Sequence, residues 1–258
     1  MPRRPNIAPE IEKAELKALL NYLGLHAAAE TYEELLAQAA KGNWPHRKLL
    51  ETLASAEAAA KKERSVQVRI ATAHFPVIKT IDTFDFAFPK LIPKDQILAA
   101  FDLAFLQGHE GFVFLGGPGT GKSHLASALG YAACLRGVRT RFTSAVDMVN
   151  DLQAALSNNR LPKTMQVYRQ PRLLIIDEVG YLPFDQKGSD LFFQVISARY
   201  ERGSTLLTTN EPFKNWGRVF ANNTVASAVI DRLAHHNELI RIEGDSYRLH
   251  HRKAQRKS

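Results

Sequence analysis

A glycine-rich octapeptide is the part of the sequence best suited to chemistry. Residues 116–123 read Gly-Gly-Pro-Gly-Thr-Gly-Lys-Ser and fit the pattern G-x-x-x-x-G-K-[ST]. Glycines let such a loop turn its backbone N–H groups onto a phosphate, and the following helix adds the positive end of its dipole. Lys122 is then expected to reach the β- and γ-phosphates, and the Ser123 hydroxyl to bind Mg²⁺. We therefore predict that the chain binds a nucleoside triphosphate.

The residues around this loop supply the context that the pattern requires. Residues 111–115, Gly-Phe-Val-Phe-Leu, read as a short buried strand, and residues 123–135 read as a helix. The alternative is a glycine-rich turn that matches by accident, and the order of strand, loop and helix weighs against it. The residues predicted to bind the nucleotide are Gly117, Pro118, Gly119, Thr120, Gly121, Lys122, Ser123 and His124.

Two adjacent carboxylates end a second apolar run. Asp177 and Glu178 come directly after Leu-Leu-Ile-Ile at residues 173–176. Ligands of open α/β sheets bind at the carboxyl ends of strands, so we expect Asp177 beside the glycine-rich loop, where it would hold Mg²⁺ together with Ser123. Glu178 would orient and deprotonate an attacking water, which favours hydrolysis over transfer to a small acceptor. The alternative is a solvated acidic turn after a core strand.

A polar amide follows another predicted strand. Residues 204–209 end at Asn210, which we expect between the glycine-rich loop and the acidic strand. There it could hold the attacking water or the γ-phosphate. An isolated asparagine in a turn would carry no such meaning, so this interpretation depends on its order in the chain. Lys122, Glu178 and Asn210 are therefore predicted catalytic residues.

Helices and short apolar strands alternate from about residue 90 onward. This alternation predicts a parallel sheet covered by helices on both faces. Between residues 74 and 89, Phe75, Phe84, Phe86 and Phe88 either line the nucleotide base or pack in the core, and the sequence leaves both readings open. The candidate strands are residues 111–115, 138–142, 172–177, 204–209 and 238–242.

The first 60 or so residues predict a small helical module. Leu16, Leu19, Leu20 and Leu23 keep helical spacing, and Gly24 is expected to end that helix. A second helix is predicted over residues 25–40 with Gly42 as its stop, and Pro45 is expected to open a third. The module contains no catalytic motif, so we interpret it as a docking or oligomerisation element.

The composition indicates an anionic partner. The 258 residues carry a formal net charge of +8, and basic residues gather at both ends. They are Arg3 and Arg4 at the start and Arg248, Arg252, Lys253, Arg256 and Lys257 at the end. Nucleic acid is the leading partner, an anionic membrane surface is the second, and a merely basic surface is the alternative to both. A single cysteine, Cys134, excludes an internal disulfide framework. With no apolar run of membrane-spanning length, a cytoplasmic protein is expected.

Taken in order, these motifs resemble those of an AAA+ ATPase. The loop at 116–123, the strand ending in Asp177-Glu178, and Thr208-Thr209-Asn210 correspond to Walker A, Walker B and sensor 1. Residues 75–85, 176–183 and 204–210 resemble the clade of DnaC helicase loaders and IstB insertion-sequence helpers, with IstB more similar. The resemblance spans about residues 65–250. It implies an α/β fold, an αβα sandwich around a five-stranded parallel sheet, with ATP and Mg²⁺ as cofactors.

The resemblance also implies residues that act between subunits and on DNA. Arg232, in Val-Ile-Asp-Arg-Leu, matches the arginine that such enzymes insert into a neighbour's active site, with Arg199 and Arg202 as weaker candidates. The initiator subgroup inserts an extra helix after its second strand, and residues 144–170 leave room for two helices broken near Asn158 and Asn159. The predicted DNA contacts on this insertion are Arg160, Lys163 and Arg169, and a solvated helical face is the alternative for each of them.

We expect three parts: a helical domain at residues 1–68, an ATPase domain at 69–250 and a basic tail at 251–258. The stretch after the last strand is too short for a full helical lid, so no sensor 2 residue is predicted. The leading hypothesis is an ATP-dependent transposition helper that oligomerises with itself on double-stranded DNA and recruits its cognate transposase. A DnaC-type helicase loader is the second hypothesis, and a monomeric P-loop kinase acting on a small molecule is the third.

Overall fold

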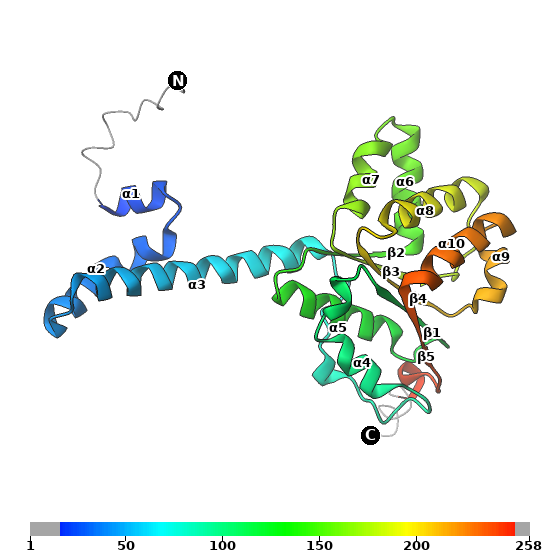
Figure 1. Cartoon of the computed structure of the whole chain (residues 1–258), viewed down its shortest axis with the longest axis horizontal. Helices are drawn as coiled ribbons and strands as arrows, with labels where there is room; N and C mark the ends of the chain where they lie inside the picture. Colours follow the sequence, from blue (N-terminus) through cyan, green and yellow to red (C-terminus); the bar gives the residue numbers. More distant parts are fainter. Residues whose placement is uncertain (1–15, 251–258) are drawn as a thin grey trace. The chain divides into compact units, whose positions relative to one another are not determined.

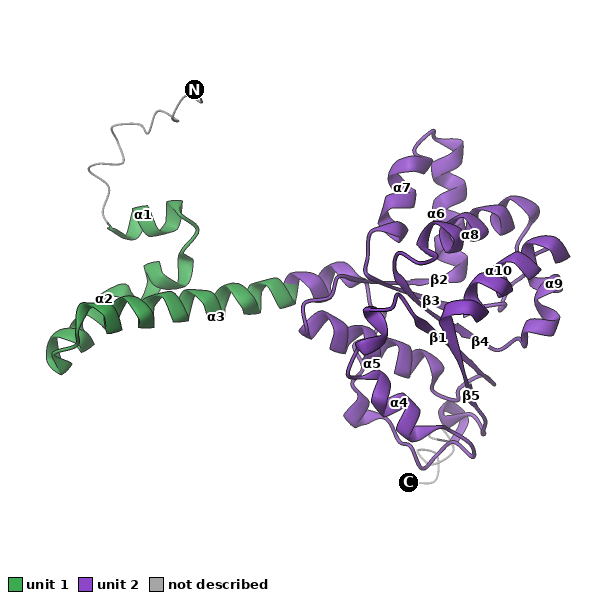
Figure 2. Cartoon of the chain, viewed as in Figure 1, with its two compact units in different colours: residues 1–67 green, residues 68–258 purple. Residues whose placement is uncertain are grey.

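The computed structural model describes residues 16–250 of the chain. The chain divides into two compact units, residues 1–67 and 68–258 (Figure 2). The basic ends noted above, Arg3 and Arg4 at the start and the predicted tail at residues 251–258, lie outside the described residues.

The first unit holds α1 (Leu16–Tyr22), α2 (His26–Gly42) and most of α3 (His46–Ala73). Its small core consists of Leu20, Ala28 and Ala29. Buried Glu57 of α3 accepts the Ala28 N–H at 3.0 Å and an Arg64 N–H at 2.7 Å. α2 ends at Gly42, the predicted stop, and the left-handed conformation that follows the helix is adopted by Asn43.

The second unit is built on a parallel five-stranded sheet with the strand order β2-β3-β4-β1-β5. This order confirms the predicted sheet, and it places the carboxyl end of β4 between those of β1 and β3. The strands are β1 (Gly111–Gly116), β2 (Thr140–Ser144), β3 (Leu173–Val179), β4 (Ser204–Thr209) and β5 (Asn237–Ile242).

Helices cover both faces of this sheet, which confirms the predicted αβα sandwich (Figure 1). Along β1, Phe112 and Phe114 pack on one face and Val113 on the other, as the alternation of side chains in a strand requires. The first face carries α4 (Lys94–Ala100) and α5 (Lys122–Leu135). The second carries α6 (Ala145–Ser157), α7 (Leu161–Arg169), α8 (Gln186–Arg199), α9 (Trp216–Val219) and α10 (Asn223–His236).

Three short 3₁₀ helices among the described residues complete the connections: η2 (Ile81–Thr83), η3 (Ala104–Leu106) and η4 (Phe213–Asn215). All strands but β4 differ from the predicted boundaries by one or two residues. β2 begins at Thr140 because the Val138 N–H bonds the Ala133 carbonyl and thereby ends α5. β3 continues to Val179 through an irregularity in its pairing with β4, where Glu178 has a φ of +62°.

The insertion between β2 and β3 forms two helices, as predicted. α6 and α7 are separated at Asn158 and Asn159, and Asn159 takes a positive φ of 54°. After β5, the described part of the chain forms one further helical segment, residues 247–250, and no lid of several helices. Among the described residues, no helix is both long and apolar enough to span a membrane.

Candidate ATP-binding and hydrolytic site

The glycine-rich loop joins β1 to α5, which begins at Lys122. Gly119 and Gly121 have φ values of +76° and +98°, a backbone region that other residues rarely adopt. A Cβ atom at Gly119 would lie 2.2 Å from the Ser246 Oγ, and one at Gly121 would lie 2.5 Å from the Phe84 ring. Both positions therefore require glycine for conformation and for space.

Lys122 is nearly buried and its ammonium is held by the loop itself. The Nζ atom donates to the Gly116 carbonyl at 2.8 Å and to the Gly117 carbonyl at 2.7 Å. Burial lowers the pKa of the Lys122 ammonium; the Asp177 carboxylate opposes this shift and the Arg248 guanidinium adds to it. The ammonium is thus poised over the loop that would surround a phosphate.

A hydroxyl and a carboxylate predicted to bind Mg²⁺ meet at the carboxyl edge of the sheet. The Ser123 Oγ donates to the Asp177 Oδ1 at 2.9 Å. Oxygen ligands of this kind suit Mg²⁺, which commonly takes one or two protein oxygens and keeps several waters. The two side chains therefore fit the ion that ATP chemistry requires.

Thr208 links the same carboxylate to the next residue of β3. Its hydroxyl donates to the Asp177 Oδ1 and accepts the Glu178 N–H at 3.0 Å. Asp177 is buried, whereas Glu178 is exposed at the irregular position of β3. The left-handed backbone at Glu178, held by Thr208, thus sets the direction in which this carboxylate leaves the strand.

A cavity of about 730 Å³ extends from the glycine-rich loop and both carboxylates to the aromatic segment after α3. Phe84 and Phe88 line it, and Phe75, Phe84 and Phe86 pack against the sheet core. Phe88 therefore fits the first of the two readings that the sequence left open, Phe75 and Phe86 fit the second, and Phe84 fits both. A cavity of this size suits a nucleotide.

His124 fastens the start of α5 to this aromatic segment. Its Nε2 atom lies 3.0 Å from the Thr80 carbonyl and 3.3 Å from the Thr83 hydroxyl, and its ring meets that of Phe84 edge to face. Burial lowers the pKa of the His124 imidazole, while the Thr80 carbonyl opposes that shift. His124 lines the cavity and shapes its wall.

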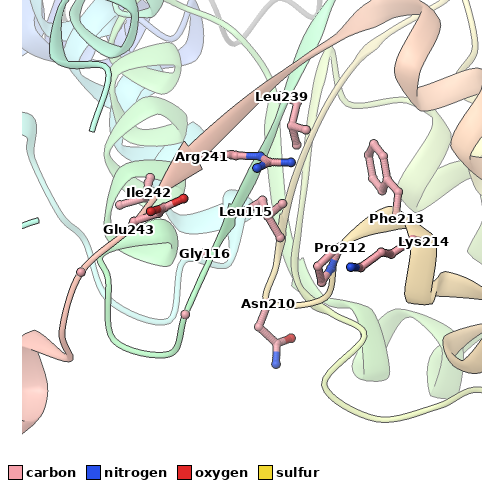
Figure 3. A pocket seen from close by; sticks show the side chains of 12 residues that line it. Leu115, Gly116, Asn210, Pro212, Phe213, Lys214, Leu239, Arg241, Ile242 and Glu243 are labelled. Carbon is pink, nitrogen blue, oxygen red and sulfur yellow. The ribbon is translucent and has the colours of Figure 1, made fainter. Parts of the chain in front are cut away.

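Asn210 lies at the end of β4, beside a second pocket of about 620 Å³. Figure 3 shows its exposed amide near the turn that follows Gly116, with Arg241 and Lys214 farther along the same pocket. The strand order brings Asn210 between the loop and the acidic strand, as predicted. It is not among the residues that line the larger cavity.

The candidate arginines of α8 and α10 have different surroundings. Arg232 is half-buried, stacks over the Phe193 ring at 4.7 Å and donates to the Ala228 carbonyl at 3.0 Å. It does not line its own chain's ATP cavity, and a residue that acts in a neighbour's site need not do so. Arg202 is exposed in the turn before β4, at the amino edge of the sheet.

Arg199 is a wrong candidate for the intersubunit arginine. Its side chain is 2% exposed, and its guanidinium donates to the Thr205 hydroxyl at 3.0 Å and to a cluster of backbone carbonyls. Burial lowers the pKa of this guanidinium to about 10. The carbonyls belong to Tyr168, Arg169, Pro171, Arg172 and Ser204. A side chain held in this way cannot reach a neighbouring subunit.

The predicted DNA contacts Arg160, Lys163 and Arg169 are all exposed on or next to α7. Among the residues that the structure describes, none of the three enters an ion pair with an acidic side chain. None of the three is among the residues that line the ATP cavity.

Sequence reasoning missed two side chains of this site. Arg248 lines the ATP cavity, because the Tyr247 N–H bonds the Gly119 carbonyl at 3.0 Å and holds residues 246–250 on the loop. The tripeptide Ser-Tyr-Arg, so soon after the last strand, was the available signal. Thr208 is the second of them, and its alternation with the apolar Leu207 along the strand is the signal that could have predicted that it faces Asp177.

Comparisons with known proteins agree with this geometry. A family model described as IstB-like ATP binding protein matches residues 18–255. The chain is 37% identical over 243 residues to a Geobacillus stearothermophilus protein of insertion sequence IS5376 described as ATP-binding, covering 94% of this chain and 97% of that one. It is 37% identical over 235 residues to the corresponding IS21 protein of Pseudomonas aeruginosa, covering 91% and 89%.

Solved structures share the fold of the second unit. The crystal structure of the DnaC helicase loader is similar with a TM-score of 0.52 and 25% identity, covering 64% of this chain and 96% of that one. AMPPCP-bound DnaA from Aquifex aeolicus is similar with a TM-score of 0.56 and 21% identity, covering 67% of this chain and 52% of that one. This second likeness extends to the fold alone.

Proposed function

Because the chain belongs to the IstB-like ATP binding protein family and is an ATPase of the AAA+ class, we propose that it is a transposition helper. In this role it oligomerises on double-stranded target DNA, deforms it and recruits its cognate transposase, while ATP hydrolysis controls assembly. Relatives that belong to insertion sequences support a role in transposition. We keep residues 1–68 as a helical docking domain and 69–250 as the ATPase domain in this proposal.

The observation that carries the hydrolytic part is the contact between Ser123 and Asp177 at 2.9 Å, with exposed Glu178 beside it. Lys122 would leave its loop carbonyls to meet the β- and γ-phosphates. Ser123 and Asp177 would hold Mg²⁺, whose charge offsets that of the phosphates. Glu178 would take the proton of the attacking water, and Asn210 would orient that water or the γ-phosphate.

Two further steps would act between molecules. Arg232 of one subunit would neutralise charge on the γ-phosphate held by its neighbour. Bound ATP would therefore link two subunits in addition to being the substrate of hydrolysis. Arg160, Lys163 and Arg169 would contact DNA phosphates without reading base edges. Oligomerisation would then align one such basic face per subunit along the duplex and raise the overall affinity.

The test is a titration of labelled duplex and single-stranded DNA across a salt series, with ATP, with ADP and without nucleotide. We expect duplex to bind more tightly, with weak sequence preference, and ATP to tighten binding. The Lys122→Ala variant is the matched control, because it should keep the nucleotide-free affinity and lose the ATP effect. Absence of binding to either nucleic acid under every nucleotide condition would refute the DNA role.

A helicase loader is the second candidate, and the likeness to the DnaC crystal structure is the observation that favours it. The same titration separates the two roles, because a loader should prefer single strands. A pull-down with a purified hexameric replicative helicase and one with the transposase of the same insertion sequence complete the test. Tight helicase binding together with single-strand preference would replace the transposition proposal.

A further inference from the structure

Two histidines and a glutamate meet at the amino edge of the sheet, opposite the glycine-rich loop. Glu201 lies in the turn between α8 and β4, and His235 and His236 end α10. Each offers one ligand atom, and these atoms all lie within 4.8 Å of one another. We propose that the three side chains form a site for a divalent transition-metal ion such as Zn²⁺, separate from the nucleotide site.

The spacing of the best-defined pair suits such an ion. The Glu201 Oε1 lies 3.6 Å from the His236 Nε2. Two ligand atoms that each lie about 2.0–2.1 Å from a tetrahedral Zn²⁺ are roughly 3.4 Å apart. A movement of a few tenths of an ångström would therefore bring both atoms onto one ion. Two histidines and a carboxylate are also a ligand set that Zn²⁺ takes, with water in the fourth position.

The hydrogen bonds of the two histidines leave nitrogen atoms for a metal. The His236 Nε2 is buried, and no hydrogen-bond partner lies within reach of it among the described residues. The His235 Nδ1 lies 2.7 Å from the Tyr200 hydroxyl. When this Nδ1 carries the proton and donates it to the tyrosine oxygen, the lone pair of Nε2 is free to bind. Metal-bound histidines are commonly oriented by such a bond from their second nitrogen.

The electrostatic surroundings favour a cation. α10 is 14 residues long and ends at His236, so the partial negative charge of its carboxyl end lies at the cluster. A pocket of about 290 Å³ is lined by both histidines and by the carboxylates Glu110 and Glu238. Both histidines therefore border an open, acidic pocket, whereas Glu201 is not among its lining residues.

A bound ion would cross-link parts of the chain that are far apart in sequence. It would tie the turn before β4 to the junction of α10 and β5. Asn210 directly follows β4, and α10 carries Arg232. Because binding to the folded chain alone raises its stability, the proposed site has a readout that does not depend on ATP hydrolysis.

The experiment uses the full chain after treatment with a chelator and its removal. Zn²⁺ and Co²⁺ are titrated in the presence of excess Mg²⁺ and ADP, so that the Asp177 site is filled. We expect one ion per chain, a visible Co²⁺ absorption band typical of tetrahedral coordination, and a rise in Tm with Zn²⁺. His236→Ala and Glu201→Gln should each weaken Zn²⁺ binding about tenfold or more and remove the rise in Tm.

Matched variants separate this site from other sources of metal binding. His26→Ala removes a histidine from the first unit, and Asp177→Asn removes the carboxylate of the nucleotide site; both should bind Zn²⁺ like the wild type. Unchanged Tm values of the His236 and Glu201 variants without metal would show that they fold. Zn²⁺ binding that is the same in wild type and His236→Ala would overturn the proposal, and the pair would then be an ordinary ion pair.

Discussion

The carboxyl edge of the sheet and the exposed side of α7 hold charged residues in opposite ways. At the sheet edge, the Asp177 carboxylate accepts hydrogen bonds from Ser123 and Thr208, and Lys122 is fixed by two carbonyls. On α7, Lys163 and Arg169 are exposed and enter no ion pair within the described part of the chain. The proposed chemistry at the sheet edge depends on the position of each atom, whereas the proposed DNA binding by α7 depends on its total charge.

The largest effects are therefore expected at the sheet edge, from Lys122→Ala and Glu178→Gln. Lys122→Ala should abolish ATP binding, because the ammonium meets the phosphates in the ground state. Glu178→Gln should keep ATP binding and lower turnover by about 10² to 10⁴, the usual contribution of a general base. Nucleotide affinity and steady-state hydrolysis should be measured for both, and wild-type turnover in Glu178→Gln would remove this residue from the mechanism.

The next largest effect is expected from Arg232→Ala, which tests whether one chain supplies every residue that ATP hydrolysis needs. Arg232→Ala should lower ATP hydrolysis about 10³-fold if the guanidinium acts in the neighbour's site. Mixing Arg232→Ala with Lys122→Ala should then restore part of the activity, since each subunit supplies what the other lacks. ATPase activity of the wild type should also rise more than linearly with protein concentration.

The control for this mixing experiment is a mixture of the Arg202→Ala variant and the Lys122→Ala variant. Because Arg202 lies at the amino edge of the sheet, its own loss should cost little activity. If the two mutants co-assemble but the Arg232 mixture recovers no activity, the intersubunit arginine is another residue.

A smaller effect is expected from substitutions of Thr208, which test how the two carboxylates of the same region are oriented. Thr208→Val removes the hydroxyl that joins Asp177 to the Glu178 backbone, so both carboxylates lose a fixed direction. We expect kcat to fall about 10- to 100-fold, as for other supporting hydrogen bonds around a metal site, with a smaller change in KM. Thr208→Ser keeps the hydroxyl and should restore kcat. Equal loss in both variants would indicate a packing role instead.

The smallest effect is expected on α7, where no single charge is decisive. Lys163→Gln with Arg169→Gln should weaken DNA binding on every sequence alike and lower the slope of log affinity against log salt by about 0.9 per lost contact. ATP hydrolysis without DNA should not change. The matched control is Arg136→Gln with Arg202→Gln, which removes the same charge elsewhere. An equal loss in the control would assign the effect to net charge.

The same contrast explains what the sequence could predict. The loop at 116–123, the carboxylates after the apolar run of β3 and the strand order follow from local patterns and from the rules of parallel sheets. Arg248 was missed because its place depends on the packing of Ser246 and Tyr247 on Gly119, a contact between distant segments. Arg199 was misjudged because its burial depends on carbonyls that only the folded chain brings together.

Finer boundaries were missed for similar reasons. β2 begins two residues later than predicted because the Val138 N–H is used at the end of α5. The irregular pairing that turns Glu178 outward has no signature in the run of apolar residues before it. Hydrophobic pattern determines which face a residue occupies, but competition for backbone hydrogen bonds determines where an element begins and ends.

The buried guanidinium of Arg199 restricts how this protein can diverge. Its five N–H donors serve one hydroxyl and five carbonyls, contributed by the end of α7, the approach to β3 and the start of β4. Lysine would keep the charge but offers three donors in a different geometry, and a neutral side chain would leave buried carbonyls unpaired. Most substitutions at this position should thus be selected against through loss of folded protein, although the residue does not line the ATP cavity.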